Sequence, residues 1–386
     1  MYIMIPARKP PPEKTRIRGF DILAAGAVTL LIILAAFNAI TNLEAAGASP
    51  GFGFLFQEAG FDVSESWIPY SPSDSYLKVI VSGVFNTIWL AAACILCATF
   101  IGVCFGLLSV GPSPIGRWLA RGYVDLFRNL PKILILLVLY AVAVNGLPHV
   151  RQSLSLGPFH LSNRALNFPT LVWSADLALT LVAFFAGMLL LAVQGRIRAG
   201  LTARGVRLSS LLFWVAPLVL PGLAMLLFGL RIDVSLPQMQ GFDYRGGGRV
   251  SLQFAIVAAT LSIYHGAQIA EVVRGGLEAI PKGQKEAANA LGLTGWQAIR
   301  LVILPQVFRI VIPPMNNQYV NLIKNTSIAI AVGYSDLMSV SGTIINQSFK
   351  PLEMMLITMA IYLGICLIVT TSLNHWHQRL TARESR

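Results

Sequence analysis

Apolar residues form long runs along this chain, separated by shorter segments that carry most of the charge. Several runs reach or exceed the roughly 18–20 residues that a helix needs to cross the hydrocarbon core of a bilayer. The pattern predicts eight membrane-spanning helices, at residues 20–40, 79–109, 123–146, 174–194, 209–230, 252–273, 309–333 and 353–373.

Three of these spans are not uniform. The second is long enough to tilt or to extend beyond the membrane. The third and the seventh are interrupted by Pro131 and by the pair Pro313 and Pro314. Proline is tolerated in such helices where neighbouring groups bond to the carbonyls that it leaves free. We therefore expect two spans with poorly defined bounds.

Composition supports a membrane protein. The 386 residues are 55% hydrophobic and only 12% charged, with a mean hydropathy of +0.67. Soluble domains are about a quarter charged, so this composition cannot provide a water-solvated surface. The predicted fold class is all-α, a polytopic membrane protein. The net charge of +12 is explained by the basic residues that orient membrane proteins, and we expect no nucleic-acid partner.

The distribution of basic residues predicts the topology. Of the 29 Lys and Arg residues, 21 fall in segments on one side of the predicted spans, seven fall on the other side, and Lys324 lies within a span. Cytoplasmic loops carry the excess of Lys and Arg. Both termini are therefore expected in the cytoplasm.

The first span has an alternative interpretation as a cleaved signal peptide, with a small-residue cleavage site at 46–48. Its apolar core of about 21 residues is longer than the 7–15 residues of such peptides. A retained membrane anchor is favoured.

Catalytic and cofactor motifs are missing or out of context. The chain has no G-x-x-x-x-G-K-[ST] and no H-E-x-x-H. Cys94 and Cys97 have C-x-x-C spacing, but no further Cys or His lies at zinc-ligand spacing, so packing is expected. A G-x-S-x-G match at 47–51 lacks the strand–helix context of a nucleophile elbow. Gly102 and Gly106 form a G-x-x-x-G pair that predicts a close helix–helix contact. We expect no catalytic residue, no metal and no bound cofactor.

Polar side chains inside the predicted spans mark a candidate substrate pathway. Lys324 is the clearest, because a charge within a span is costly and usually faces a bundle interior or an aqueous path. Asn317, Asn321 and Lys324 follow i, i+4, i+7 spacing and share one helical face. The predicted pathway residues are Asn86, Thr87, His265, Gln268, Asn317, Asn321, Lys324 and Ser327. Two alternatives stay open: the amides form interhelical hydrogen bonds, and Lys324 extends to the membrane interface.

One polar segment, "RGGLEAIPKGQKEAANALGLTGWQAIRLVILP" at 274–305, stands out among the apolar runs. It predicts a short helix at 284–291 that begins after Pro281 and stops at Gly292. A helix of this length is marginal alone in water. It therefore needs a partner surface, and the chain predicts no soluble domain that would supply one.

Two motifs in this segment resemble the EAA loop of ABC-importer permeases. They are "EAANALG" at 286–292 and, nine residues later, "VILP" at 302–305. The one departure is Val302, where Ile is usual. The resemblance implies that a cytoplasmic helix docks in a groove of an ATPase subunit. The implied coupling residues are Glu286, Ala287, Ala288, Gly292, Leu304 and Pro305.

Further blocks resemble the polar amino-acid permeases, in particular the larger, eight-span permease of bacterial general L-amino-acid importers. They are "GVFNTIWLA" at 83–91, "YVDLFRNLP" at 123–131, "EVVRGGLEAIPKGQ" at 271–284 and "NLIKNTSIA" at 321–329. "LSIYHGAQIAE" at 261–271 departs from the family pattern, which leaves the inherited substrate specificity open.

The resemblance implies a five-helix type I importer core and a division of the chain into three parts. Residues 1–78 hold a basic segment, the first span and a periplasmic loop. Residues 79–375 form the permease domain, with an inserted hairpin at about 174–230 and a coupling loop at 271–308. Residues 376–386 form a cytoplasmic tail.

The implied protein is a subunit of an ATP-driven importer of broad-range or polar L-amino acids in the bacterial inner membrane. The implied partners are an ATPase dimer that holds ATP and Mg, a second homologous permease, a periplasmic binding protein, amino-acid substrate and membrane lipid. A heterodimer of permeases is expected, and a homodimer is the alternative.

Two other classes of protein are weighed against this one. A gradient-driven secondary transporter would be expected to carry a membrane Asp or Glu that relays protons, but the acidic residues lie at span edges. An intramembrane enzyme is disfavoured because no paired acid, Ser/His or metal cluster converges within a span.

Overall fold

The computed structural model describes all residues except 1–18, 46–50, 173, 204–209, 229–232 and 383–386. The first basic residues, the small-residue segment after the first span and the end of the tail thus lie outside the described part. The helices are α1 (Gly19–Ala45), α2 (Tyr76–Val110), α3 (Pro114–Asn129), α4 (Lys132–Gly146), α5 (Ala175–Ala203), α6 (Ser210–Phe228), α7 (Leu252–Glu278), α8 (Lys282–Ala290), α9 (Gly295–Ala298), α10 (Leu304–Asn325), α11 (Leu337–Ser348) and α12 (Pro351–Ala382).

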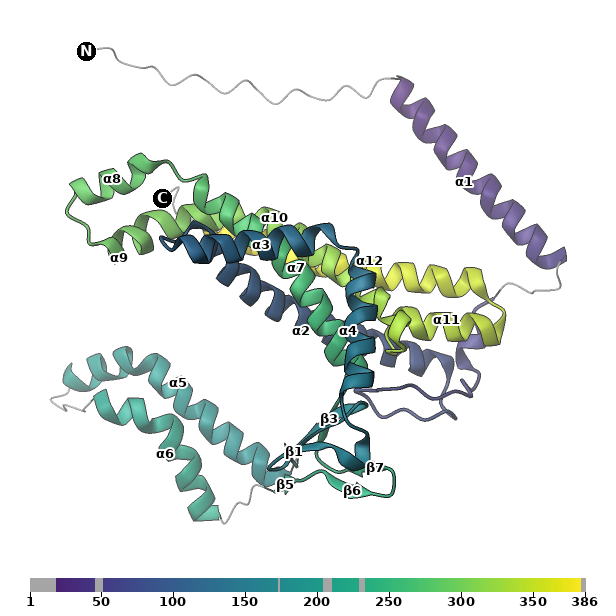
Figure 1. Cartoon of the computed structure of the whole chain (residues 1–386), viewed down its shortest axis with the longest axis horizontal. Coiled ribbons are helices and arrows are strands. Elements are labelled where there is room, and N and C mark those ends of the chain that lie inside the picture. The colour runs from purple at the N-terminus through teal and green to yellow at the C-terminus, as the bar shows by residue number, and fades with distance from the viewer. Residues whose placement is uncertain (1–18, 46–50, 173, 204–209, 229–232, 383–386) are drawn as a thin grey trace.

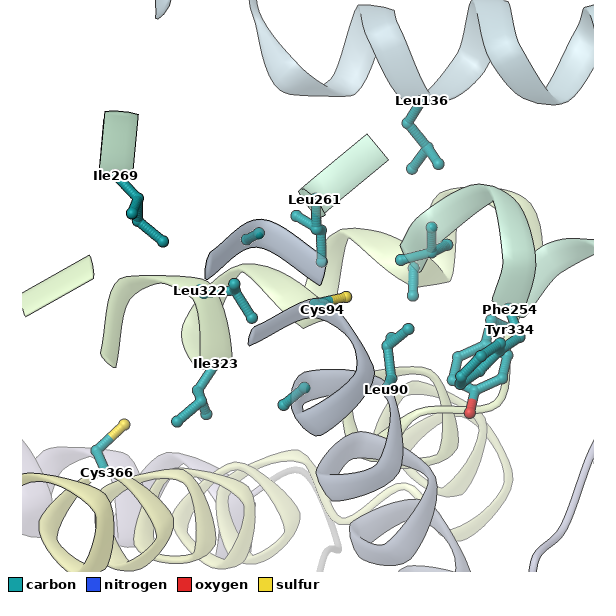
Figure 2. Close-up of a cluster of buried hydrophobic side chains, with 14 of the residues drawn as sticks. Leu90, Cys94, Leu136, Phe254, Leu261, Ile269, Leu322, Ile323, Tyr334 and Cys366 are labelled. Atoms are coloured by element: carbon teal, nitrogen blue, oxygen red, sulfur yellow. The ribbon is translucent and has the colours of Figure 1, made fainter. Parts of the chain in front are cut away.

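The long helices α2, α7, α10 and α12 pack as one bundle, and α11 lies at the end of it opposite α8 and α9 (Figure 1). The bundle core is apolar and includes Leu90, Cys94, Leu261, Ile269 and Leu322, each fully buried (Figure 2). Cys94 thus packs as a hydrophobic side chain, as predicted.

One close contact in the bundle joins α2 to α7 through two glycines. A Cβ atom on Gly102 would lie 2.5 Å from Cγ2 of Ile269, and one on Gly106 would lie 2.7 Å from Cβ of Val273. Real Cβ atoms do not approach so closely, so only glycine lets the backbones meet here. The close contact predicted from the G-x-x-x-G pair is confirmed.

The third predicted span, 123–146, is not one helix. Helices α3 and α4 meet at an angle of 102°. Leu130, which precedes Pro131, is extended, with φ −87° and ψ 137°. Proline disfavours the helical conformation of the residue before it, so the helix ends at Asn129 and restarts after Pro131. The predicted span is thus broken into two helices at Pro131, the residue that interrupts its apolar run in the sequence.

The seventh predicted span, 309–333, behaves in the opposite way. Pro313 and Pro314 lie inside α10 without ending it. Helical structure continues from Gly295 to Val332, through a π-helical turn at Ile299–Ile303 before α10 and a 3-10 segment at Thr326–Val332 after it. Leu304 and Pro305 therefore lie within a continuous helix, although the sequence suggested an end of the loop there.

Two features have no counterpart among the predicted elements. Helix α11 is capped by Asp336, whose Oδ1 accepts the backbone N–H of Ser339 at 2.9 Å. A four-stranded antiparallel sheet of order β1-β2-β3-β8 is formed by Leu154–Leu156, Phe159–Leu161, Ala165–Phe168 and Gly248–Ser251. Two further strand pairs are β4–β5 (Thr170–Leu171 with Val234–Ser235) and β6–β7 (Gln238–Gln240 with Asp243–Arg245).

Helices α5 and α6, which lie at the position of the predicted hairpin, pair with each other. They follow β4 and precede β5, and in Figure 1 they stand apart from the bundle. The β4–β5 ladder, with Leu171 opposite Val234, closes the base of the insertion.

Among the described residues, five helical segments are long and apolar enough to cross a membrane, or six if the bent α3–α4 pair is one span. They fall on α2, α5, α7, α12 and the segment Gly295–Val332. Helices α1 and α6 contain shorter apolar stretches, Ile22–Ala35 and Val219–Phe228. The total of eight spans stays a prediction.

Candidate functional site

Helix α8 is the short helix expected between the polar residues of the loop, and it forms one end of the molecule together with α9 (Figure 1). Ala288 is buried, at 2% exposure, whereas Glu286 and Ala287 are exposed. The small Ala288 side chain thus lets α8 rest on the helix that follows, and Glu286 is left on the outer face.

Gly292 ends α8 for a conformational reason. Its φ is +75°, in the left-handed region that residues with a Cβ atom disfavour. The N–H of Gly292 donates to Asn289 O at 2.9 Å, and the N–H of Leu293 donates to Ala288 O at 3.1 Å. These two bonds are a Schellman motif, which satisfies the last carbonyls of the helix.

The chain after Gly292 restarts as a helix at once. Thr294 and Gln297 form a capping box in which each side chain bonds the backbone of the other residue. Leu291, which follows α8, and Trp296, in α9, are 81% and 68% exposed. The tip of this loop therefore presents two large apolar side chains next to the exposed helix that carries Glu286.

The loop is linked to α10 by Gln306. Its Nε2 donates to Oε1 of Gln284 at 3.1 Å and to the carbonyl of Val302 at 2.9 Å. Val302 belongs to the π-helical turn just before Pro305, where regular helical bonding is interrupted. A displacement of α8 would thus reach α10 directly through Gln284.

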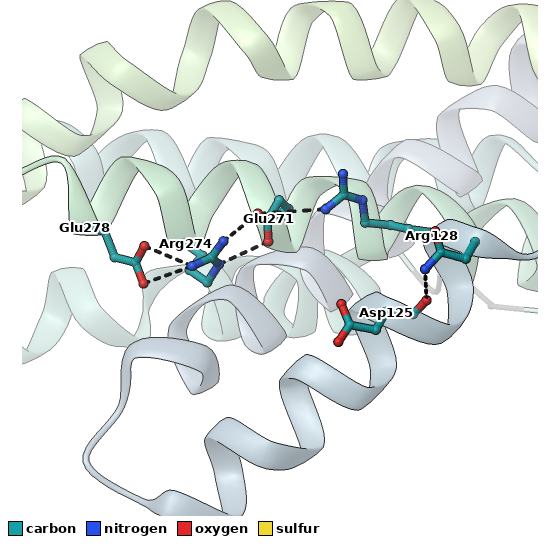
Figure 3. A network of polar contacts seen from close by, with 6 residues as sticks. Asp125, Arg128, Glu271, Arg274 and Glu278 are labelled. Carbon is teal, nitrogen blue, oxygen red and sulfur yellow. Dashed lines mark hydrogen bonds and ion pairs between the residues drawn. The ribbon is translucent and has the colours of Figure 1, made fainter.

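A charged network joins α7 to α3 near this end of the bundle (Figure 3). Arg274 Nη2 lies 2.5 Å from Glu271 Oε1, and Arg274 Nη1 lies 2.9 Å from Glu278 Oε2. Arg128 approaches Glu271 at 3.8 Å. The two ion pairs within α7 could have been predicted from the sequence, because their residues have i, i+3 and i, i+4 spacing. The contact between Arg128 of α3 and Glu271 could not, because it depends on how the two helices pack.

Four of the predicted pathway residues line one polar cleft of about 380 Å³. They are His265, Gln268, Asn321 and Lys324. The other four lining residues are Lys132, Tyr264, Gln318 and Asn325. Helices α7 and α10 contribute most of the lining, and Lys132 comes from the first turn of α4.

Asn325 holds two sides of this cleft together. Its Oδ1 accepts a hydrogen bond from Lys132 Nζ, and its Nδ2 lies 3.1 Å from His265 Nε2. The ammonium of Lys132 also lies 5.9 Å from the ring centroid of Tyr264. Side chains of α4, α7 and α10 are thus fixed against each other at the cleft.

The other predicted pathway residues lie elsewhere. Asn86 is fully buried and donates to the carbonyls of Glu65 and Ser335, both at 2.7 Å. Thr87 Oγ1 accepts the N–H of Leu337 at 2.9 Å. Both residues thus attach the start of α11 to α2, which is the interhelical alternative raised for the amides.

Asn317 is exposed on α10, one turn from Asn321. Ser327 donates to the carbonyl of Lys324 at 2.9 Å and lines a neighbouring cleft, about 500 Å³ and mainly apolar, between α10, α11 and α12. Lys324 lines both clefts. Sequence reasoning missed Lys132 as a cleft residue, because it counted Lys132 among the loop charges.

Known proteins resemble this chain over most of its length. The family model for "binding-protein-dependent transport system inner membrane component" matches residues 98–383. The general L-amino acid transport system permease protein AapQ of Rhizobium johnstonii is 35% identical over 357 residues, which are 90% of this chain and 88% of that protein.

The glutamate/glutamine/aspartate/asparagine transport system permease protein BztB of Rhodobacter capsulatus is 32% identical, over 96% of this chain and 95% of that protein. A solved structure of an amino acid ABC transporter with histidines is 18% identical, with a TM-score of 0.47, and the match covers 79% of this chain and 95% of that chain. The chain belongs to the family of binding-protein-dependent transport system inner membrane components, and it is a multi-pass permease.

Proposed function

We propose that this chain is the permease subunit of an ABC importer that carries polar or broad-range L-amino acids across the bacterial inner membrane. The observation that carries the proposal is α8, an exposed, tightly capped helix at one end of the bundle. The named substrates of AapQ and BztB support amino acids as the cargo.

The proposed partner at α8 is an ATPase dimer, which binds ATP and Mg and hydrolyses ATP. Glu286 and Ala287 lie on the exposed face that enters the ATPase groove, and Leu291 and Trp296 add apolar contacts beside it. A second homologous permease, a periplasmic binding protein and membrane lipid complete the assembly.

The proposed orientation has both termini in the cytoplasm. Helix α12 runs from α11 toward the end of the bundle that carries α8 and α9, which supports a C-terminus on the side of the ATPase (Figure 1). The proposed substrate path includes the polar cleft, through His265, Gln268, Asn321 and Lys324.

The coupling role is tested by a matched pair of glycine variants. Gly292→Ala places a Cβ atom in the left-handed conformation, at a cost of about 1–2 kcal/mol, and should loosen the end of α8. Gly283→Ala lies in the same helix with ordinary φ and open space around it. We expect Gly292→Ala and Glu286→Ala to lower ATP-driven uptake in proteoliposomes by about tenfold or more, and Gly283→Ala to retain it.

Capture of substrate by the binding protein should stay intact in all three variants, because it does not involve this loop. Uptake at the wild-type rate in both Gly292→Ala and Glu286→Ala would refute the docking role. Vanadate separates the proposal from a gradient-driven carrier, because it traps the ATPase and should stop uptake only if ATP hydrolysis drives it.

A further inference from the structure

The polar cleft carries an excess of positive charge. Lys132 and Lys324 are two of its eight lining residues, and none of the eight is Asp or Glu. In the part of the chain that the structure describes, no ion pair is formed by either lysine. Two ammonium groups in a membrane-spanning bundle without a counter-charge favour an anionic ligand.

The N-terminus of α4 strengthens the positive field at the same place. The helix begins at Lys132, and Pro131, its N-cap residue, provides no side-chain acceptor. The first N–H groups of a helix have no partner within it, and they give this end a partial positive charge. The uncapped helix end and the Lys132 ammonium thus act on the same side of the cleft.

The remaining lining suits the ammonium group of an amino acid. Gln268, Gln318 and Asn321 each offer an amide oxygen that accepts hydrogen bonds. His265 is 2% exposed, and its Nδ1 has no hydrogen-bond partner. An α-ammonium can thus be held by these amide oxygens while carboxylates approach the lysines. His265 is a donor here, because its Nε2 accepts from Nδ2 of Asn325 and the proton of the neutral ring is on Nδ1.

We propose that the cleft selects dicarboxylic amino acids, the class of glutamate and aspartate, with one carboxylate toward Lys132 and the other toward Lys324. A neutral zwitterion offers a carboxylate to only one lysine and adds no net charge, whereas an acidic amino acid offers one to each lysine and neutralises one of the two net charges in a site partly shielded from water. This inference rests on the proposed function and assigns a substrate preference to its path.

The test measures ligand binding to the purified permease–ATPase complex without the binding protein, so that only the membrane site selects. Calorimetry with L-glutamate, L-aspartate, L-glutamine and L-arginine should show glutamate and aspartate binding about tenfold or more tightly than the other two. Lys132→Gln and Lys324→Gln should each weaken glutamate binding by about tenfold, since a charge-assisted bond is lost. Glutamine has only its α-carboxylate, so the variant that removes the lysine facing that group should weaken glutamine binding by as much, and the other variant should change it by less than about threefold. Lys324→Arg keeps the charge and should retain most of the preference.

Lys78→Gln is the control, because Lys78 lies in the first turn of α2, pairs with Asp74 of the preceding loop and is not among the residues that line the cleft. Equal losses for glutamate and glutamine in both lysine variants, no loss for glutamate in either variant, or no glutamate binding to the wild-type complex would overturn the inference. The proposed function is tested separately, by vanadate-sensitive uptake of any amino acid. If the reconstituted wild-type complex shows no such uptake, the importer function is refuted, whereas the measured ligand preference of the cleft is unaffected.

Discussion

At the scale of single residues, burial and hydrogen bonding act in opposite directions on the pKa of the Asp336 carboxyl group. The residue is fully buried, caps α11 and accepts a hydrogen bond from Tyr362 Oη at 3.3 Å. Burial raises the pKa of Asp336 to about 6, although the N–H groups at the start of α11 act in the opposite direction. The ionised cap thus opposes folding near neutral pH.

The sign of the resulting pH dependence follows from linkage. A folded pKa of about 6 lies above the ordinary value of 3.8 for an aspartate side chain, so the folded state binds more protons between these values and becomes more stable as pH falls. Asp336→Asn keeps an N-cap side chain but cannot titrate. From pH 7 to about pH 4.5 we expect the free energy of unfolding of the wild type to gain about 2 kcal/mol relative to Asp336→Asn.

Thermal unfolding of both proteins in detergent, measured over this pH range, checks the prediction. Glu65, whose pKa is also raised by burial, is present in both proteins and largely cancels in the difference. Parallel curves for the two proteins would contradict the titration of Asp336.

At the scale of elements, the contact between α2 and α7 depends on the absence of side chains. Gly102→Ala would insert a methyl group against Ile269 and the carbonyl of Gly266, and overpacking of this kind costs about 1–3 kcal/mol. We expect a corresponding loss of stability in denaturant titrations of the purified permease. Gly122→Ala is the control, since a Cβ atom on Gly122 meets nothing within 4 Å and alanine favours the helix. Equal stability of the two variants would show that α2 and α7 can separate at little cost.

At the scale of the whole molecule, the two ends of the inserted hairpin meet at the β4–β5 ladder in the part of the chain that the structure describes. Val172 N donates to Asp233 O at 2.8 Å, directly above the β4–β5 ladder. The chain thus leaves and returns on adjacent antiparallel strands, and a two-residue Asn-Gly turn can join them.

Excision of residues 173–232 with such a turn should leave the bundle folded, with a melting temperature within about 5 °C of the full chain. The hairpin supplies two predicted spans, so its removal preserves the side on which every later loop lies. Removal of 175–203 alone leaves an odd number of crossings and is expected to abolish folding. Thermal unfolding and thiol accessibility of a cysteine at 283 measure both outcomes, and a collapsed bundle in the first variant would contradict the modular attachment.

How much of this could be predicted from sequence depends on the range of the interactions. Long apolar runs specified α2, α7 and α12, because membrane crossing requires length and hydropathy that are visible locally. Pro131 and Pro313 have the same local chemistry, yet only the first coincides with a break, since packing decides whether a kinked helix continues. Strand β3 pairs with β8 more than eighty residues later, and no local pattern reports that pairing.

The same limit applies to the polar cleft. Lys324 could be predicted because a charge within an apolar span is conspicuous. Lys132 could not, since it lies within the interrupted third span, was counted among the cytoplasmic charges, and reaches the cleft from the first turn of α4 after the α3–α4 break. The six coupling residues were found by resemblance, and the left-handed φ of Gly292 now supplies a physical reason for one of them.

The helical segment from Gly295 to Val332 is continuous, and its regular hydrogen bonding is interrupted at the π-helical turn beside Pro305. A bend of the segment at this turn would therefore move all of the helix beyond it. Lys324 lies nineteen residues beyond that proline, about 28 Å along the axis at 1.5 Å per residue. A bend of only about 5° at the π-helical turn would therefore move the Lys324 backbone by roughly 2–3 Å. A small rotation of α8 would be magnified into a displacement comparable to the length of a hydrogen bond, which is enough to open or close a polar contact at the cleft.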